Sequence, residues 1–151
     1  MKKIIFPALL VFGISLFSSC AKKNDAPTNT TPTSSFSASV SGKAWSATSF
    51  TATTNSVATI IKGTAADGSY MQLDLPATVK VGVDSLSTSS TGYAFQYNNT
   101  VTDYTTKSGT IKFTSYSNKV LIGTFTVTIE DPSNPSLLKF ISNGSFTAIF
   151  Q

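Results

Sequence analysis

Apolar and polar residues alternate along most of the chain after residue 35, with the period of two that a half-buried β-strand requires. The clearest case is the segment 121–130, in which Phe125, Val127 and Ile129 share one face and three threonines share the other. We expect the apolar face to line a core and the threonine face to contact solvent. Strands are predicted in the same way at residues 36–41, 44–50, 57–62, 70–75, 79–84, 93–97, 111–113 and 138–150.

Turn-forming residues separate these strands. Residues 42–43 (Gly-Lys) suit a tight turn, and residues 67–68 (Asp-Gly) are a hairpin signal. Pro76 ends a strand because it has no N–H to donate to a neighbouring strand. Residues 130–136 (EDPSNPS) contain two prolines and predict a loop.

The pair Asn143-Gly144 has two interpretations. By itself it is a strong signal for a hairpin turn. However, the long strand that ends at Glu130 needs a partner of similar length after the proline loop. A continuous last strand with a glycine bulge supplies that partner, so we favour the bulge.

The number and spacing of the strands, with no amphipathic helix between them, predict an all-β domain. We expect an antiparallel β-sandwich of about eight or nine strands over residues 36–151, with one core. The alternative is a calycin-like up-and-down β-barrel that binds a small apolar ligand. The two differ inside, because such a barrel needs an empty interior of at least about 300 Å³ and a sandwich has a filled core.

The N-terminus has the features of a secretory signal that ends just before Cys20. Two lysines near the start precede an apolar stretch at residues 4–17, and small residues follow it. This stretch is too short for a comfortable membrane span. The segment resembles the lipobox of bacterial lipoproteins, although Phe17 stands where leucine is usual. The resemblance implies a signal peptide at residues 1–19 and a lipid on the Cys20 thiol.

Residues 20–35 are predicted to be a lipidated, disordered tether. They have no apolar side chain large enough to bury a face against a core. Ala21 follows the lipidation site, in place of the aspartate that marks inner-membrane retention in enterobacterial lipoproteins. We therefore expect an outer-membrane lipoprotein of the cell envelope, with the membrane as its first partner.

The amino-acid composition excludes several kinds of catalytic and binding site. The chain has one cysteine and no histidine or arginine. It therefore cannot build a Ser-His-Asp or Cys-His catalytic arrangement, a His or Cys zinc site, or an arginine clamp. From residue 36 onward seven lysines face six acidic residues, which leaves no strong basic surface for nucleic acid. We expect no cofactor, no metal site and no nucleic-acid partner.

Aromatic residues are the main candidates for binding a ligand. The sole tryptophan, Trp45, is expected to anchor the core, with ligand stacking as its alternative role. The stripe at residues 93–97 (Tyr, Phe and Tyr at alternate positions) suits a core strand better than a sugar-stacking surface. Three other tyrosines fall on the outward-facing positions of predicted strands or in turns. They are Tyr70, Tyr104 and Tyr116, and we expect them to be exposed and able to stack on a ligand.

Carboxylates permit two further chemistries, both of which we disfavour. A calcium site from Asp67, Asp103, Glu130 and Asp131 lacks the spacing of an EF-hand loop. A glycosidase needs a second acid near Glu130, and Asp131 next to it on a strand would point to the opposite face. We therefore expect a protein that is not an enzyme.

Several segments taken together resemble a family of secreted Bacteroidota lipoproteins that is known only as a domain of unknown function. The segments are residues 36–47 (FSASVSGKAWSA), 108–116 (SGTIKFTSY), 123–125 (GTF) and 141–146 (ISNGSF). The resemblance implies a β-rich lipoprotein and assigns no catalytic residue. Separately, residues 84–86 (Asp-Ser-Leu) resemble the O-glycosylation acceptor of exported Bacteroidota proteins, which makes Ser85 a candidate site.

The function expected from the sequence is a non-catalytic binding or structural accessory module of the cell envelope. A glycan or an envelope protein is the expected partner. A glycan-binding module would require exposed aromatic residues in a groove, and a calycin-like barrel would require an empty apolar interior.

Overall fold

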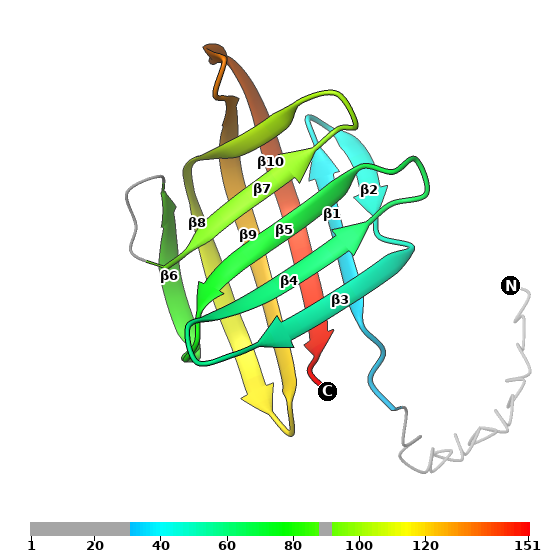
Figure 1. The fold of residues 1–151 in the computed structure, drawn as a ribbon, viewed down its shortest axis with the longest axis vertical. Coiled ribbons are helices and arrows are strands. Elements are labelled where there is room, and N and C mark those ends of the chain that lie inside the picture. Colours follow the sequence, from blue (N-terminus) through cyan, green and yellow to red (C-terminus); the bar gives the residue numbers. More distant parts are fainter. Residues whose placement is uncertain (1–30, 88–91) are drawn as a thin grey trace, which may run out of the picture. The chain divides into compact units, whose positions relative to one another are not determined.

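The computed structural model describes residues 31–87 and 92–151, which form ten antiparallel strands (Figure 1). The all-β antiparallel prediction is confirmed. Among the described residues, no helix is long and apolar enough to cross a membrane. The strands are β1 (Ser35–Val40), β2 (Lys43–Ser46), β3 (Ser49–Thr54), β4 (Ala58–Thr64), β5 (Tyr70–Pro76), β6 (Gly82–Ser87), β7 (Ala94–Asn98), β8 (Asp103–Ser117), β9 (Val120–Asp131) and β10 (Asn134–Ile149).

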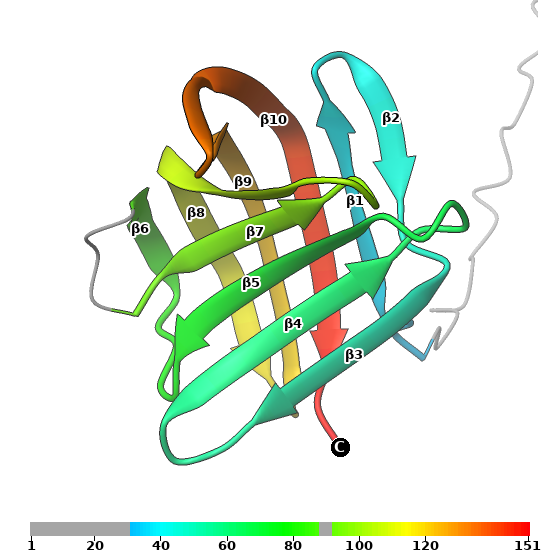
Figure 2. The ribbon, with the colours of Figure 1, turned by 45° about the horizontal axis from the view of Figure 1, so that its top comes forward.

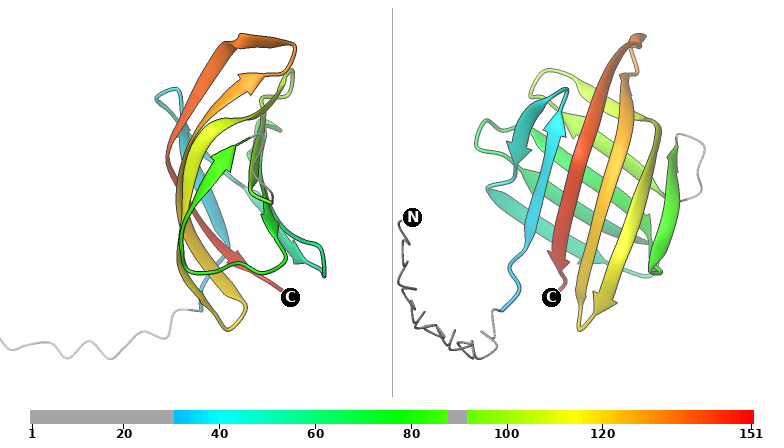
Figure 3. Two further views of the ribbon diagram at one scale, coloured as in Figure 1. Left: turned by 90° about the vertical axis from the view of Figure 1, so that its left-hand side faces the viewer. Right: turned by 180° about the vertical axis from the view of Figure 1, so that it is seen from behind.

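All ten strands belong to one sheet, which curls over on itself. Its strand order is β2-β1-β10-β9-β8-β7-β5-β4-β3, and β6 pairs with β8 beside this path. Figure 3 shows the result as two layers that pack face to face. One layer contains β3, β4, β5 and β7, and the other contains β1, β2, β6, β8, β9 and β10. The fold therefore has the two layers of a sandwich and the continuous sheet of an up-and-down barrel.

The two ends of this sheet meet where β2 runs into β3 (Figure 2). The sequence predicted one strand at residues 44–50, but the chain bends at Ala47 and Thr48. The Ala47 N–H donates to the Phe36 carbonyl in β1, and the Thr48 N–H donates to the Thr64 carbonyl in β4. One bent segment thus connects both layers, and the sheet forms a half-barrel.

Strand β8 makes the other corner. Its first residues pair with β7, its middle pairs with β6, and β9 pairs with it along most of its length. The register with β9 shifts between Thr106 and Ser108, where β8 passes from one layer to the other. An extra residue at such a bulge increases the local bend of a strand.

The space between the layers is filled by side chains. Phe125, Val127 and Ile129 of β9 are buried, whereas Thr124 and Thr126 are exposed, so the predicted parity of β9 is confirmed. The Phe125 ring centroid lies 5.2 to 6.5 Å from three other phenylalanine rings, at positions 36, 95 and 146. Such separations are typical of aromatic pairs that pack in a core.

The glycine bulge in the last strand is confirmed. The pairing of β10 with β9 shifts register between Ile141 and Gly144, and Asn143 has a φ of 51°. A Cβ on Gly144 would lie about 2.5 Å from carbons of the Phe125 ring. Glycine at this position therefore leaves room for a core phenylalanine.

Three further local predictions are wrong. The first tight turn is at Ser41-Gly42, because both residues have the positive φ of a two-residue hairpin turn, and Lys43 already lies in β2. The proline segment 130–136 contains only a short turn, since β9 ends at Asp131 and β10 begins at Asn134.

The third wrong prediction is the strand at residues 79–84. Val79 is buried, but Val81 and Val83 are 61% and 65% exposed. Gly82, with a φ of 148°, takes a backbone conformation that other residues rarely adopt. The alternation of inward and outward positions is interrupted at Gly82. In β6 the even-numbered positions face inward instead of the odd-numbered ones, so Leu86 is buried in the core.

Candidate ligand-binding pocket

One opening of the half-barrel contains a pocket of about 350 Å³, close to the small end of the range for small-molecule sites, about 300–1,000 Å³. The turn between β1 and β2, the turn between β4 and β5, strand β7 and strand β10 surround it. We call it the Trp45 pocket. It is lined by Val40, Ser41, Lys43, Ala44, Trp45, Asp67, Tyr97 and Lys139.

Trp45 forms one wall of this pocket. It lies opposite Ala38 in β1, is 8% exposed, and packs edge-on against Phe36 with ring centroids 5.8 Å apart. Its indole N–H donates a hydrogen bond of 2.8 Å to the buried Ser69 hydroxyl. Trp45 therefore anchors the core, as expected, and also lines the pocket with the part of its ring that is not covered.

Asp67 is held at the rim by the same network. Its Oδ1 accepts hydrogen bonds from the Ser69 hydroxyl (2.6 Å) and the Ser69 N–H (2.9 Å). These two bonds lower the pKa of Asp67 below its usual value, so the carboxylate is ionised at neutral pH. The carboxylate thus presents a fixed hydrogen-bond acceptor to the pocket.

Tyr97 of β7 forms another wall. Burial raises the pKa of its phenol, and the nearby negative charge of Asp67 raises it further, so the phenol remains neutral at neutral pH. Its ring lies 6.1 Å from that of Tyr104, which is also buried. Two buried tyrosines therefore support the side of the pocket opposite the hairpin of β1 and β2.

Two lysines complete the rim. Lys43 begins β2 directly after the Ser41-Gly42 turn. The Ser41 N–H in this turn donates a 2.8 Å hydrogen bond to the Phe140 carbonyl of β10. Lys139 of β10 places its Nζ 4.9 Å from the centre of the Tyr104 ring. Within the part of the chain that the structure describes, the one ion pair is Lys107–Glu130, so neither rim lysine is paired with an acid.

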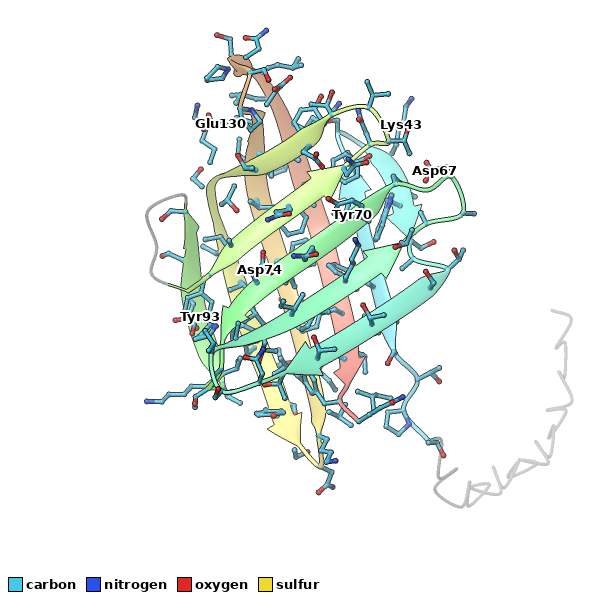
Figure 4. The ribbon with its side chains drawn as sticks, in the orientation of Figure 1. Lys43, Asp67, Tyr70, Asp74, Tyr93 and Glu130 are labelled. Atoms are coloured by element: carbon cyan, nitrogen blue, oxygen red, sulfur yellow. The ribbon has the colours of Figure 1, made fainter. Side chains whose placement is uncertain are left out.

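Figure 4 shows how the charged residues are distributed. Lys43 and Asp67 lie near the same corner of the domain, while Glu130 lies on its other side. Lys43, Asp67 and Lys139 line one pocket although 96 positions separate the two lysines in the sequence. The pairing of β1 with β2 and β10 brings the two lysines together, and the curl of the sheet brings Asp67 to them from the other layer.

The other aromatic candidates do not join this pocket. Tyr70 of β5 is half-buried, and the Lys62 ammonium lies 3.8 Å from its ring centre, over one face of the ring. Tyr104 is only 3% exposed, so the expectation that it is exposed is wrong, because β8 turns it into the core. Tyr116 is 47% exposed and packs edge-on against Phe150. Trp45 is the one of these aromatic candidates that lines the pocket, and it is joined there by Tyr97, for which the core was the favoured expectation over sugar stacking.

The acidic residues have separate local roles. Asp103 accepts hydrogen bonds from Tyr70 and Asn98, Glu130 pairs with Lys107 at 2.8 Å, and Asp131 accepts from the Ser133 N–H in its turn. In residues 31–87 and 92–151, no three acidic side chains come close enough to hold a metal ion. Glu130 and Asp131 therefore have different partners and do not converge on a common site.

A second hollow lies on the threonine face of β8, β9 and β10. Its volume is about 500 Å³, and it is lined by residues that include Thr110, Thr126 and Lys112. It contains one charged side chain and little aromatic surface, which comes from the edge of Phe125. The Trp45 pocket is the stronger candidate because it combines two aromatic walls with both signs of charge.

Two modification candidates lie elsewhere. Ser85 is exposed in β6, between half-buried Asp84 and buried Leu86, so its hydroxyl is accessible in the folded domain. Cys20 and the predicted signal peptide lie outside the described residues, as does most of the tether. Strand β1 begins at Ser35, one residue before the start predicted for the domain.

The fold and the pocket define a class of protein: an all-β half-barrel domain with an aromatic, charged pocket at one opening. The chain belongs to the family described as a domain of unknown function (DUF6252), which matches residues 32–149. The comparison found no match among curated proteins or solved structures. The matched residues include all ten strands, from Ser35 to Ile149.

Proposed function

We propose that this protein is a lipid-anchored, non-catalytic binding module of the outer membrane, which binds its ligand in the Trp45 pocket. One observation carries the binding role. The pocket brings Trp45 and Tyr97 together with Asp67 and two lysines that form no ion pair in the described part of the chain, in a volume suited to a small molecule. Polar groups that converge beside aromatic and aliphatic side chains are usual features of a binding site.

The filled interior argues against the calycin-like alternative. An apolar ligand inside the half-barrel would have to displace the phenylalanine rings around Phe125. The Trp45 pocket instead lies between the turn of β1 and β2 and the turn of β4 and β5, and it contains three charged side chains. A polar ligand bound at the opening of the half-barrel suits these residues better than an apolar ligand inside it.

The membrane anchor is supported by the sequence around Cys20. Two or more acyl chains hold a protein stably at a membrane, because each buried CH₂ adds about 0.8 kcal/mol. We expect Cys20→Ser to abolish acylation in a Gram-negative host and to yield unprocessed precursor or released protein. The measurement is detergent partitioning together with labelling by a palmitate analogue. Ser19→Ala, which keeps a small residue beside the acylated position, should be labelled normally. Labelling of Cys20→Ser would contradict the lipoprotein proposal.

Binding without turnover is the second part of the proposal. Trp45 is the only tryptophan and lines the pocket, so a change in its fluorescence reports binding beside it. We expect members of a glycan and small-molecule library to change this fluorescence saturably, with no product released from any glycoside. Glu130 lies in an ion pair with Lys107 and away from the pocket, so Glu130→Gln should leave binding unchanged. Reproducible sugar release that Glu130→Gln abolishes would instead identify a glycosidase.

A further inference from the structure

The Trp45 pocket has an excess of positive charge. Lys43 and Lys139 contribute two ammonium groups to its rim, and Asp67 contributes one carboxylate. Ion pairing within the described part of the chain neutralises neither lysine. A ligand with one negative charge would balance the pocket, and a charge-assisted hydrogen bond to an ammonium group is stronger than a neutral one.

Asp67 indicates a second feature of the ligand. Both bonds from Ser69 reach Oδ1, so Oδ2 is the oxygen that is available to a ligand. This carboxylate is ionised, because hydrogen bonds from Ser69 lower its pKa. An ionised carboxylate only accepts hydrogen bonds, so its partner on the ligand must carry a donor such as a hydroxyl group.

The walls indicate a third feature. Trp45 and Tyr97, each 8% exposed, present small parts of their rings, and Val40 and Ala44 add aliphatic surface between the charged groups. A pocket of about 350 Å³ suits a ligand of one or two rings rather than a long acyl chain. The ligand should therefore have an apolar ring face as well as hydroxyl groups and a negative charge.

These three features occur together in an acidic sugar. We propose that the Trp45 pocket binds a uronic-acid type sugar, with its carboxylate between Lys43 and Lys139, a hydroxyl group on Asp67 and its ring against Trp45. This inference rests on the proposed binding role and specifies its ligand. The sugar is either free or a terminal unit of a longer acidic glycan, and both present the same carboxylate and hydroxyl groups to the pocket.

The test uses the full-length lipidated protein in detergent micelles, with Trp45 fluorescence and calorimetry as readouts. D-galacturonate is the probe, and D-galactose is the matched control that lacks only the carboxylate. We expect galacturonate to bind at least about tenfold more tightly than galactose, as the loss of a charge-assisted contact predicts. Trigalacturonate tests for a longer glycan: tighter binding than the monomer indicates that further sugar units contact the protein, and equal binding indicates that one sugar unit makes all the contacts.

Charge-removing variants locate the site. Lys43→Gln and Lys139→Gln should each weaken galacturonate binding about tenfold and leave galactose binding unchanged. Lys80→Gln, at an exposed lysine outside the pocket, should change neither.

Equal affinities for galacturonate and galactose, or tighter binding of galactose 6-phosphate than of galacturonate, would overturn the assignment of a sugar carboxylate. If such ligands still quench Trp45, the binding role remains and only the ligand class is wrong. If no compound in the library perturbs Trp45, the binding role itself fails.

Discussion

Replacing Phe125 with alanine should lower the free energy of unfolding by about 3–5 kcal/mol, the usual cost of removing a buried phenylalanine ring. The ring is 3% exposed and packs against Phe36, Phe95 and Phe146 from both layers of the half-barrel. Its loss opens a cavity where the two layers meet, and Gly144 has no side chain to fill it. Chemical denaturation followed by circular dichroism measures the change.

Thr126→Ala is the matched control, one position along the same strand. Thr126 is exposed, and its hydroxyl lies 3.3 Å from that of Thr110 across the pair of strands. Exposed substitutions of this kind usually change stability by less than about 0.5 kcal/mol. Similar losses for the two variants would mean that the threonine face of β9 is covered by a partner, or that the core does not depend on Phe125.

The sequence predicted those parts of the fold that depend on local alternation. The inward parity of β5 and β9 was predictable because buried and polar residues alternate there without interruption. The bulge at Asn143-Gly144 was predictable from the length that a partner for β9 needs. The failures have a common cause, which is backbone geometry that alternation does not encode. The bend at Ala47 depends on hydrogen bonds to β1 and β4, and the change of facing at Gly82 depends on its positive φ.

The candidate pocket was only partly predictable for the same reason. Trp45 stood out as the only tryptophan, but Tyr97 follows the parity of a core strand and carries no separate signal. Lys43 and Lys139 lie far apart in the sequence, and only the pairing of β1 with both β2 and β10 brings them to one rim. The signal that sequence reasoning missed is the Asp-x-Ser segment at residues 67–69, whose turn geometry holds the carboxylate at the pocket.

The corner in β8 gives the second large expected effect. Gly109 lies opposite Val127, two residues after the shift in register, at the point where β8 has left β7 and pairs with β6. A Cβ at this position would lie 2.5 Å from the Thr126 carbonyl oxygen and 2.8 Å from the Val127 Cα. These atoms belong to the backbone of a central strand, so a change of side-chain rotamer cannot relieve the contact.

Gly109→Ala should therefore force β8 away from β9 and lower the free energy of unfolding by about 1–3 kcal/mol, the typical cost of overpacking. The same displacement would disturb all three strands that pair with β8, so thermal unfolding should also become less cooperative. Ser108→Ala, at the exposed neighbouring position, should leave the melting temperature nearly unchanged because it removes only a surface hydroxyl group. If Gly109→Ala melts like Ser108→Ala, then β8 does not approach β9 as closely as the half-barrel requires, and the corner that joins its two layers must lie elsewhere in the sheet.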